Sequence, residues 1–189
     1  MPVQKQIGDE SSSANQFLQQ IFESRMKNEI DENDLLYILN HTELSRTFDR
    51  NSTFNIDHSK LLIAAIAHSK NTLTYPEFVT VVNLLHSWRN LFRRHDLDRN
   101  GIIEPYALVN ILNSLRFNLS PSTLETVVKR YSTRADEHSS PKVTFEHYIQ
   151  VCARLTLLND LMHQKSGNGS PRSICSFSID EFMQLALNL

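Results

Sequence analysis

Apolar residues recur with helical spacing through most of the 189-residue chain. Residues 17–22 place apolar side chains at i, i+3 and i+4, which predicts an amphipathic helix. Two apolar-rich stretches, Phe78 to His95 and Tyr148 to Gln164, predict long helices that link one segment to the next without a break. Another helix is expected to begin at Pro121, with Ser120 as its N-cap, because proline is tolerated at the first helical position. This pattern predicts an all-α protein.

A six-residue pattern, two apolar residues separated by four variable ones, recurs five times. The copies are Ile30–Leu35, Leu73–Phe78, Ile103–Leu108, Val143–Tyr148 and Phe177–Phe182. Each follows a polar or irregular stretch and precedes an apolar-periodic segment, so the sequence indicates helix–loop–helix repeats. We expect the first apolar residue of each copy to pair, in a short extended segment, with the same residue of a neighbouring repeat. The alternative is an unrelated helical bundle. Such a bundle could contain one copy of this loose pattern by chance, but five copies are not expected to arise that way.

Residues 96–107, which overlap the third copy, have the composition of a twelve-residue calcium loop. The candidate ligands are the side chains of Asp96, Asp98, Asn100 and Glu104 and the carbonyl of Ile102, with Gly101 at the sharp turn. Position 12, where calcium loops carry a bidentate glutamate, is Ala107. About five protein ligands remain where calcium prefers six to eight. We therefore expect this loop to bind calcium weakly, or magnesium, or no ion at cytosolic calcium.

The first two loops lack most calcium ligands. The first, from about Glu23 to Asp34, carries Arg25 and Lys27 at early positions and a short aspartate at position 12. The second, which ends at Glu77, is one residue short and keeps only that glutamate. Calcium binding is not expected in either loop.

The last two loops are equally degenerate. The fourth carries roughly four extra residues between Tyr131 and Val143, and His147 stands at position 12. Its Asp136-Glu137-His138 cluster suggests zinc as an alternative, but a plain polar loop is favoured because no recognised ligand spacing is present. The fifth loop, Ser170 to Glu181, offers no ion cage.

Five such repeats resemble the penta-EF-hand family. Local similarities are carried by Phe54–Asp57, Trp88–Phe92, Leu119–Leu124 and Val128–Ser132. Residues 1–15 are short and polar and are expected to form a flexible leader, unlike the Gly/Pro-rich leader of the family. The resemblance implies one domain over residues 16–189. Its hands are expected near residues 17–44, 58–85, 86–117, 121–155 and 156–189.

The resemblance also implies how the hands associate. Hands one and two pair, hands three and four pair, and the fifth pairs with the fifth hand of a second protein, which gives a homodimer or a heterodimer. The expected interface residues are Phe177, Ile179, Phe182, Met183, Leu185 and Leu187. The alternative is that these apolar side chains pack only within the chain.

Charge and cysteine content narrow the partners and the location. A formal net charge of -2 and a pI of about 6.4 give no basic bias toward nucleic acid. No apolar stretch reaches the roughly 18 residues needed to span a bilayer, so membrane association is permitted by the sequence but not indicated. Two cysteines do not make a disulfide framework, and a cytoplasmic location is expected.

No catalytic constellation is present in the sequence, so an enzyme is not expected. Cys152 follows His147 but stands among apolar helical residues, which favours a buried small side chain over a thiol nucleophile. The expected function is a dimeric adaptor or regulator that binds protein or peptide targets, with weak or degenerate calcium binding. Two alternatives stay open: a calcium-independent heterodimer partner of another penta-EF-hand protein, and the regulatory subunit of a calpain-like cysteine protease.

Overall fold

The computed structural model describes residues 4–48, 53–67, 70–117, 119–134, 139–166 and 178–179. Its helices are α1 (Gln4–Glu23), α2 (Glu32–His41), the 3-10 helix η1 (Glu43–Thr47), α3 (Ile56–Ala67), α4 (Tyr75–Arg93), α5 (Pro105–Ser114), α6 (Pro121–Tyr131) and α7 (Phe145–Ser166). The strands are β1 (Ile102–Ile103) and β2 (Val143–Thr144). The all-α fold with short β contacts is confirmed, and the fifth repeat lies almost entirely outside the described residues.

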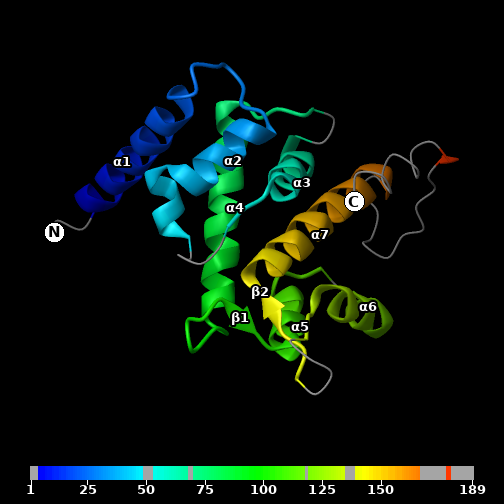
Figure 1. Cartoon of the computed structure of the whole chain (residues 1–189). Helices are drawn as coiled ribbons and strands as arrows, with labels where there is room; N and C mark the ends of the chain where they lie inside the picture. Colours follow the sequence, from blue (N-terminus) through cyan, green and yellow to red (C-terminus); the bar gives the residue numbers. More distant parts are fainter. Residues whose placement is uncertain are drawn as a thin grey trace.

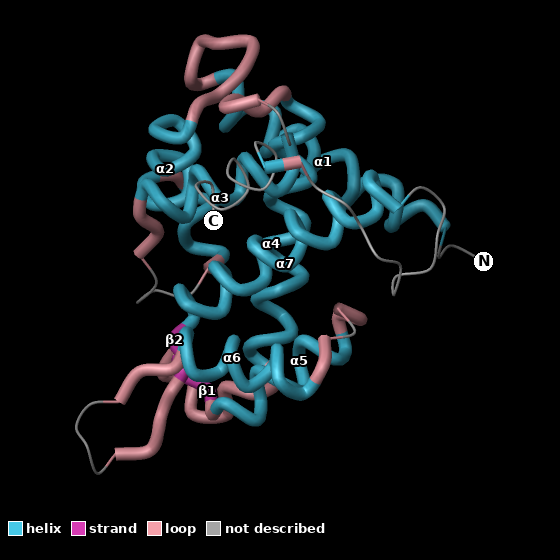
Figure 2. The backbone as a smooth tube through the Cα atoms, turned by 90° about the vertical axis from the view of Figure 1, so that its right-hand side faces the viewer, coloured by secondary structure: helices cyan, strands magenta, loops and turns pink. Residues whose placement is uncertain are grey.

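Helix α4 connects two groups of elements. Helices α1, α2 and α3 lie around one end of it, whereas β1, β2, α5 and α6 lie at the other end (Figure 1). Helix α7 packs on both α3 and α4, so it joins the two groups through the middle of the molecule (Figure 2). Among the described helices, none is both long enough and apolar enough to cross a lipid bilayer.

Local sequence signals explain where several helices begin. The predicted start of α6 is confirmed: Ser120 is the N-cap, and its hydroxyl accepts a hydrogen bond from the Thr123 backbone N–H at 3.2 Å. Pro121 then takes the first helical position, where no intrahelical donor is required. The two predicted long helices are observed as α4 and α7, with slightly different ends.

The first apolar residues of neighbouring repeats pair as predicted. The Ile30 N–H donates to the Leu73 carbonyl at 2.9 Å, and the Leu73 N–H donates back at 2.8 Å. In the other pair, Ile103 of β1 lies opposite Val143 of β2 in an antiparallel register. All four side chains are buried, so each loop pair is closed over the core. The corresponding residue of the fifth copy, Phe177, lies outside the described residues.

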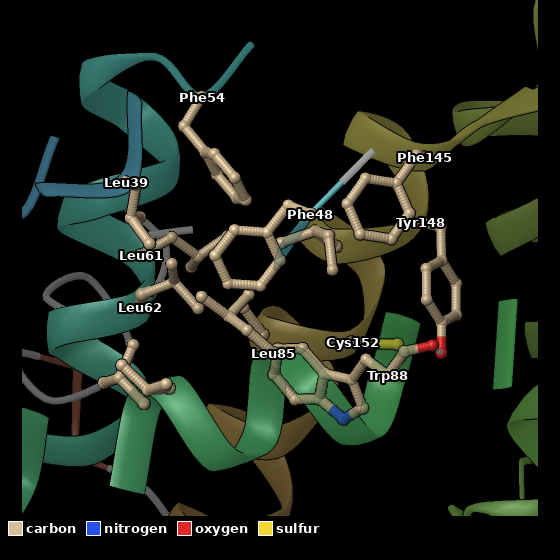
Figure 3. Packing of buried hydrophobic residues seen from close by; sticks show 14 of the residues in the cluster. Leu39, Phe48, Phe54, Leu61, Leu62, Leu85, Trp88, Phe145, Tyr148 and Cys152 are labelled. Carbon is tan, nitrogen blue, oxygen red and sulfur yellow. Dashed lines mark hydrogen bonds between the residues drawn. The ribbon is translucent and has the colours of Figure 1, made fainter. Parts of the chain in front are cut away.

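The buried apolar residues of the described part of the chain form one hydrophobic core that extends along α4 and α7. Leu85 and Trp88 of α4 face the helices of the first group, and Tyr148 and Cys152 of α7 lie on the other side (Figure 3). The Tyr148 hydroxyl donates to the Trp88 carbonyl at 3.1 Å. Cys152 is fully buried, and burial raises the pKa of its thiol, which suppresses the nucleophilic thiolate. The prediction of a core cysteine is confirmed.

The start of the chain differs from the expectation of a flexible leader over residues 1–15. Helix α1 begins at Gln4 and continues to Glu23, so most of the expected leader is helical. The sequence from Gln4 to Ser13 is polar except for Ile7 and Gly8, and hydrophobic periodicity detects only helices that have an apolar face. A polar helical extension therefore leaves no apolar pattern to find.

Candidate ion-binding loops

Four of the connections between the described helices contain the loops of the first four predicted repeats. Loop one (24–31) lies between α1 and α2, loop two (68–74) between α3 and α4, loop three (94–104) between α4 and α5, and loop four (132–144) between α6 and α7. Residues 68–69 and 135–138 of these loops are outside the described residues.

Loop three has the turned backbone of a calcium loop, held by its own hydrogen bonds. The buried Asp96 carboxylate accepts from the Asn100 N–H at 3.1 Å and from the Gly101 N–H at 2.9 Å. Gly101 has φ of +77°, a conformation that side chains disfavour, so glycine suits this turn. The Asn100 side-chain oxygen accepts from the Ile102 N–H at 2.9 Å. Backbone donors therefore hold Asp96 and Asn100 in the loop.

Glu104, at position 9 of the same loop, is paired with a residue of loop four. Its carboxylate accepts from the ammonium group of Lys142. Lys142 is placed there by the two backbone hydrogen bonds between it and Thr133, both 2.8 Å, which close loop four as a hairpin. The extra residues of loop four thus bring a cation to a carboxylate of loop three.

The donor groups of loop three, as placed, do not fit a calcium cage. Asp98 and Asn100 are exposed, and Ala107 is buried and brings no oxygen to position 12. Throughout the described part of the chain, no three acidic, histidine or cysteine side chains are close enough to share a metal ion. Calcium prefers six to eight oxygens. The assignment of Asp96, Asp98, Asn100, Ile102 and Glu104 as metal ligands stays a prediction.

In loop one, the acidic residue at position 12 is paired with the two early cations. Asp34 accepts from the guanidinium of Arg25 at 2.9 Å and from the ammonium of Lys27 at 2.6 Å. Burial acts to raise the pKa of Asp34, but the hydrogen bonds from Lys27 and Arg25 outweigh it and hold the pKa below the usual 3.8. These ion pairs could have been predicted from the sequence, because two cationic residues and an acidic residue lie at opposite ends of one short loop.

In loop two, Glu77 caps helix α4. Its carboxylate accepts from the Thr74 N–H at 2.7 Å and from the Thr74 hydroxyl at 2.7 Å. This is the glutamate half of a capping box, in which the third helical residue reaches back to the N-cap. Glu77 is the one acidic residue that loop two retains at a ligand position, and its carboxylate is used to cap a helix.

The remaining predicted site residues are only partly described. His147, in the first turn of α7, donates its backbone N–H to the Thr144 hydroxyl at 3.3 Å. The Asp136-Glu137-His138 cluster of loop four lies outside the described residues. Of the expected interface residues, Ile179 is 83% exposed. The other five, Phe177, Phe182, Met183, Leu185 and Leu187, fall outside the described residues, so the interface also stays a prediction.

Comparison with known proteins gives similar sequences with recognised names. No family model matches the chain. Sorcin from Mus musculus is 31% identical over 137 residues, which cover 72% of this chain and 65% of sorcin. Grancalcin from Pongo abelii is 26% identical over 157 residues, which cover 82% of this chain and 67% of grancalcin. The chain thus matches slightly less than two thirds of the length of sorcin.

A solved structure supports the same fold. It is that of a homologue of programmed cell death 6 protein from Leishmania major Friedlin. The two folds agree with a TM-score of 0.55 at 15% sequence identity, over 90% of this chain and 92% of the other. At this identity the likeness concerns the fold alone.

Proposed function

Because the chain belongs to the penta-EF-hand family, we propose that it is an adaptor or regulator of other proteins whose hands hold their shape with little or no calcium. One observation supports this proposal: most of the carboxylates that remain at ligand positions, although not the exposed Asp98, are engaged by the protein itself. Asp34 binds two cations, Glu77 caps a helix and Glu104 binds Lys142. In a molecule of this kind, side-chain contacts within the protein hold the loops in shape, so an ion is not needed for that purpose.

Hand three is the proposed site for whatever ion response remains. Asp96, Asp98, Asn100, the Ile102 carbonyl and Glu104 would supply oxygens, and water would complete the shell. Magnesium retains water readily and needs six ligands, so it is the alternative occupant. A change from sensor affinity to the affinity of weak extracellular sites, about 10⁻⁶ M to about 10⁻³ M, corresponds to about 4 kcal/mol. The missing carboxylate at position 12 accounts for a large part of such a loss.

Isothermal titration of the full chain with calcium tests this proposal. We expect saturation only near millimolar calcium or no heat of binding, and no heat in the variant D96A/D98A. The variant A107E restores a bidentate carboxylate and should bind calcium more tightly, whereas A107Q, of the same size without the charge, should not. A micromolar site in the unmodified chain would contradict weak binding. Equal affinities of A107E and A107Q would contradict the role given to position 12.

We also propose that the protein acts as a dimer through its fifth hand, in the cytoplasm and without enzymatic activity of its own. The apolar residues of the last segment support this proposal, as does the pairing of the other four hands with one another. A calcium-independent heterodimer is the second candidate, favoured by the ion pairs of loop one.

Sedimentation velocity separates these forms of assembly. A homodimer gives twice the chain mass at micromolar concentration, and F182D/L185D should reduce it to the mass of one chain. The control Y106D changes an exposed aromatic residue of α5 and should leave the mass unchanged. A chain that is monomeric alone and doubles only with another penta-EF-hand protein supports the heterodimer. A monomer under all conditions contradicts both.

A further inference from the structure

We propose that loop one is closed by an internal latch, in which the cationic groups of Arg25 and Lys27 take the place of a divalent ion. In a calcium-binding hand, the ion joins early loop positions to the acidic residue at position 12 and so fixes the exit helix relative to the loop. Here Arg25 and Lys27 stand early in the loop, and Asp34 lies in the first turn of the exit helix α2.

Both oxygen atoms of the Asp34 carboxylate are engaged by donors, as both oxygens of a bidentate carboxylate are engaged by an ion. Its Oδ1 atom accepts from Nε of Arg25 at 2.9 Å, and Nη2 of the same guanidinium forms an ion pair with it at 2.9 Å. Its Oδ2 atom accepts from Nζ of Lys27 at 2.6 Å and from the Asp31 N–H at 3.3 Å. Nζ of Lys27 also donates to the Asp31 carboxylate at 3.1 Å. The ammonium group therefore lies between the two acidic residues at positions 9 and 12, which in other hands face the ion.

Burial makes these contacts obligatory for the fold. The Asp34 side chain is only 4% exposed, and a buried carboxylate without a cation is strongly unfavourable. The Arg25 guanidinium also lies over the ring of Tyr37 on α2, 4.4 Å from its centre, which is a cation–π contact. Arg25 thus contacts α2 at two points, one turn apart.

The length of loop one fits this arrangement. The connection from the end of α1 at Glu23 to Ile30 is shorter than the connection from the end of α4 at Arg93 to Ile103. A shorter loop has fewer residues with which to wrap around an ion, whereas side-chain cations reach Asp34 directly. Ile30, which follows the latch, forms the backbone bridge to Leu73 of loop two. The latch thereby fixes the pairing of hands one and two in the absence of calcium, whether or not hand three binds an ion or the chain dimerises.

Hydrogen exchange of the Ile30 and Leu73 amides in the full chain tests the latch locally. In the unmodified chain we expect both amides to be protected in EDTA, with the same protection after calcium is added. The variant R25M/K27M keeps the aliphatic stems but removes both charges, and we expect exchange at these amides to be about tenfold faster or more. The control K60M makes the same substitution at an exposed lysine of α3 and should leave exchange unchanged.

Two results would overturn the proposal: protection in the unmodified chain that appears only with calcium, or exchange in R25M/K27M that equals that of the unmodified chain. If R25M/K27M does not fold, K27M alone leaves Arg25 paired and must still accelerate exchange. The variant R25M/K27M/D34N removes the unpaired carboxylate as well. It should recover the fold but not the protection at Ile30 and Leu73, and full protection in it would also contradict the latch.

Discussion

Lys142 occupies a carboxylate that would otherwise be available to bind an ion in loop three. Glu104 is the position-9 residue of loop three, yet its carboxylate is bound by an ammonium group from loop four. A cation that enters loop three must compete with this group. Both side chains are more than a third exposed, so the pair contributes only about 0–1 kcal/mol to the fold.

Replacing Lys142 by methionine should therefore release Glu104 without harming the protein. We expect calcium or magnesium to bind loop three up to about fivefold more tightly in K142M, since about 1 kcal/mol of competition is removed. The unfolding midpoint should change little. Titration calorimetry measures the affinity, and K129M, at an exposed lysine of α6, is the matched control. An affinity that falls in K142M would show that Lys142 supports the site.

At the scale of elements, the sequence predicted what is set by neighbouring residues. The start of α6 at Pro121, the long helices α4 and α7, and the paired first residues of the repeats all follow from local patterns. Lys142 and Glu104 are 38 residues apart, and nothing in either local sequence indicates that they meet. The helical start of α1 was missed for a related reason, because its polar residues leave no apolar period to detect.

Glu77 stands at a ligand position of loop two but acts as a capping residue of α4. The variant E77A removes the capping box of α4 and should lower stability by about 1 kcal/mol, or the unfolding midpoint by about 2–4 °C. The variant E77Q keeps a side-chain oxygen that can cap the helix, so it should stay close to the unmodified chain. Neither should alter calcium binding. If both variants lost a calcium response present in the unmodified chain, Glu77 would be an ion ligand and not mainly a cap.

At the scale of the whole molecule, the contact between α3 and α7 joins the two pairs of hands. The buried His58 of α3 lies at this contact, where its Nδ1 atom accepts from the Asn55 N–H at 3.0 Å and its Nε2 atom is 3.2 Å from the Gln150 amide of α7. Accepting through Nδ1 requires a neutral ring. Burial lowers the pKa of His58 below the usual 6.5, and this outweighs the opposing effect of Glu146 and Asp57.

The position of His58 predicts that mild acid lowers the free energy of unfolding, because a charged ring would weaken the contact between α3 and α7. Below about pH 6.5 the unfolded chain binds a proton at His58 that the folded chain resists, so the free energy of unfolding falls with pH by at most about 1.4 kcal/mol per unit and per histidine. His86 of α4, whose pKa burial also lowers, contributes in the same direction. Urea unfolding between pH 7.5 and pH 5.5 measures the slope.

The variant H58N/H86N should flatten this slope even if it is less stable throughout, because no proton uptake at these two positions remains. Stability that rises as the pH falls from 7.5 to 5.5 would mean that His58 is charged in the folded protein. Since a charged ring cannot accept from the Asn55 N–H, that result would require a different contact between α3 and α7, and with it a different arrangement of the two pairs of hands.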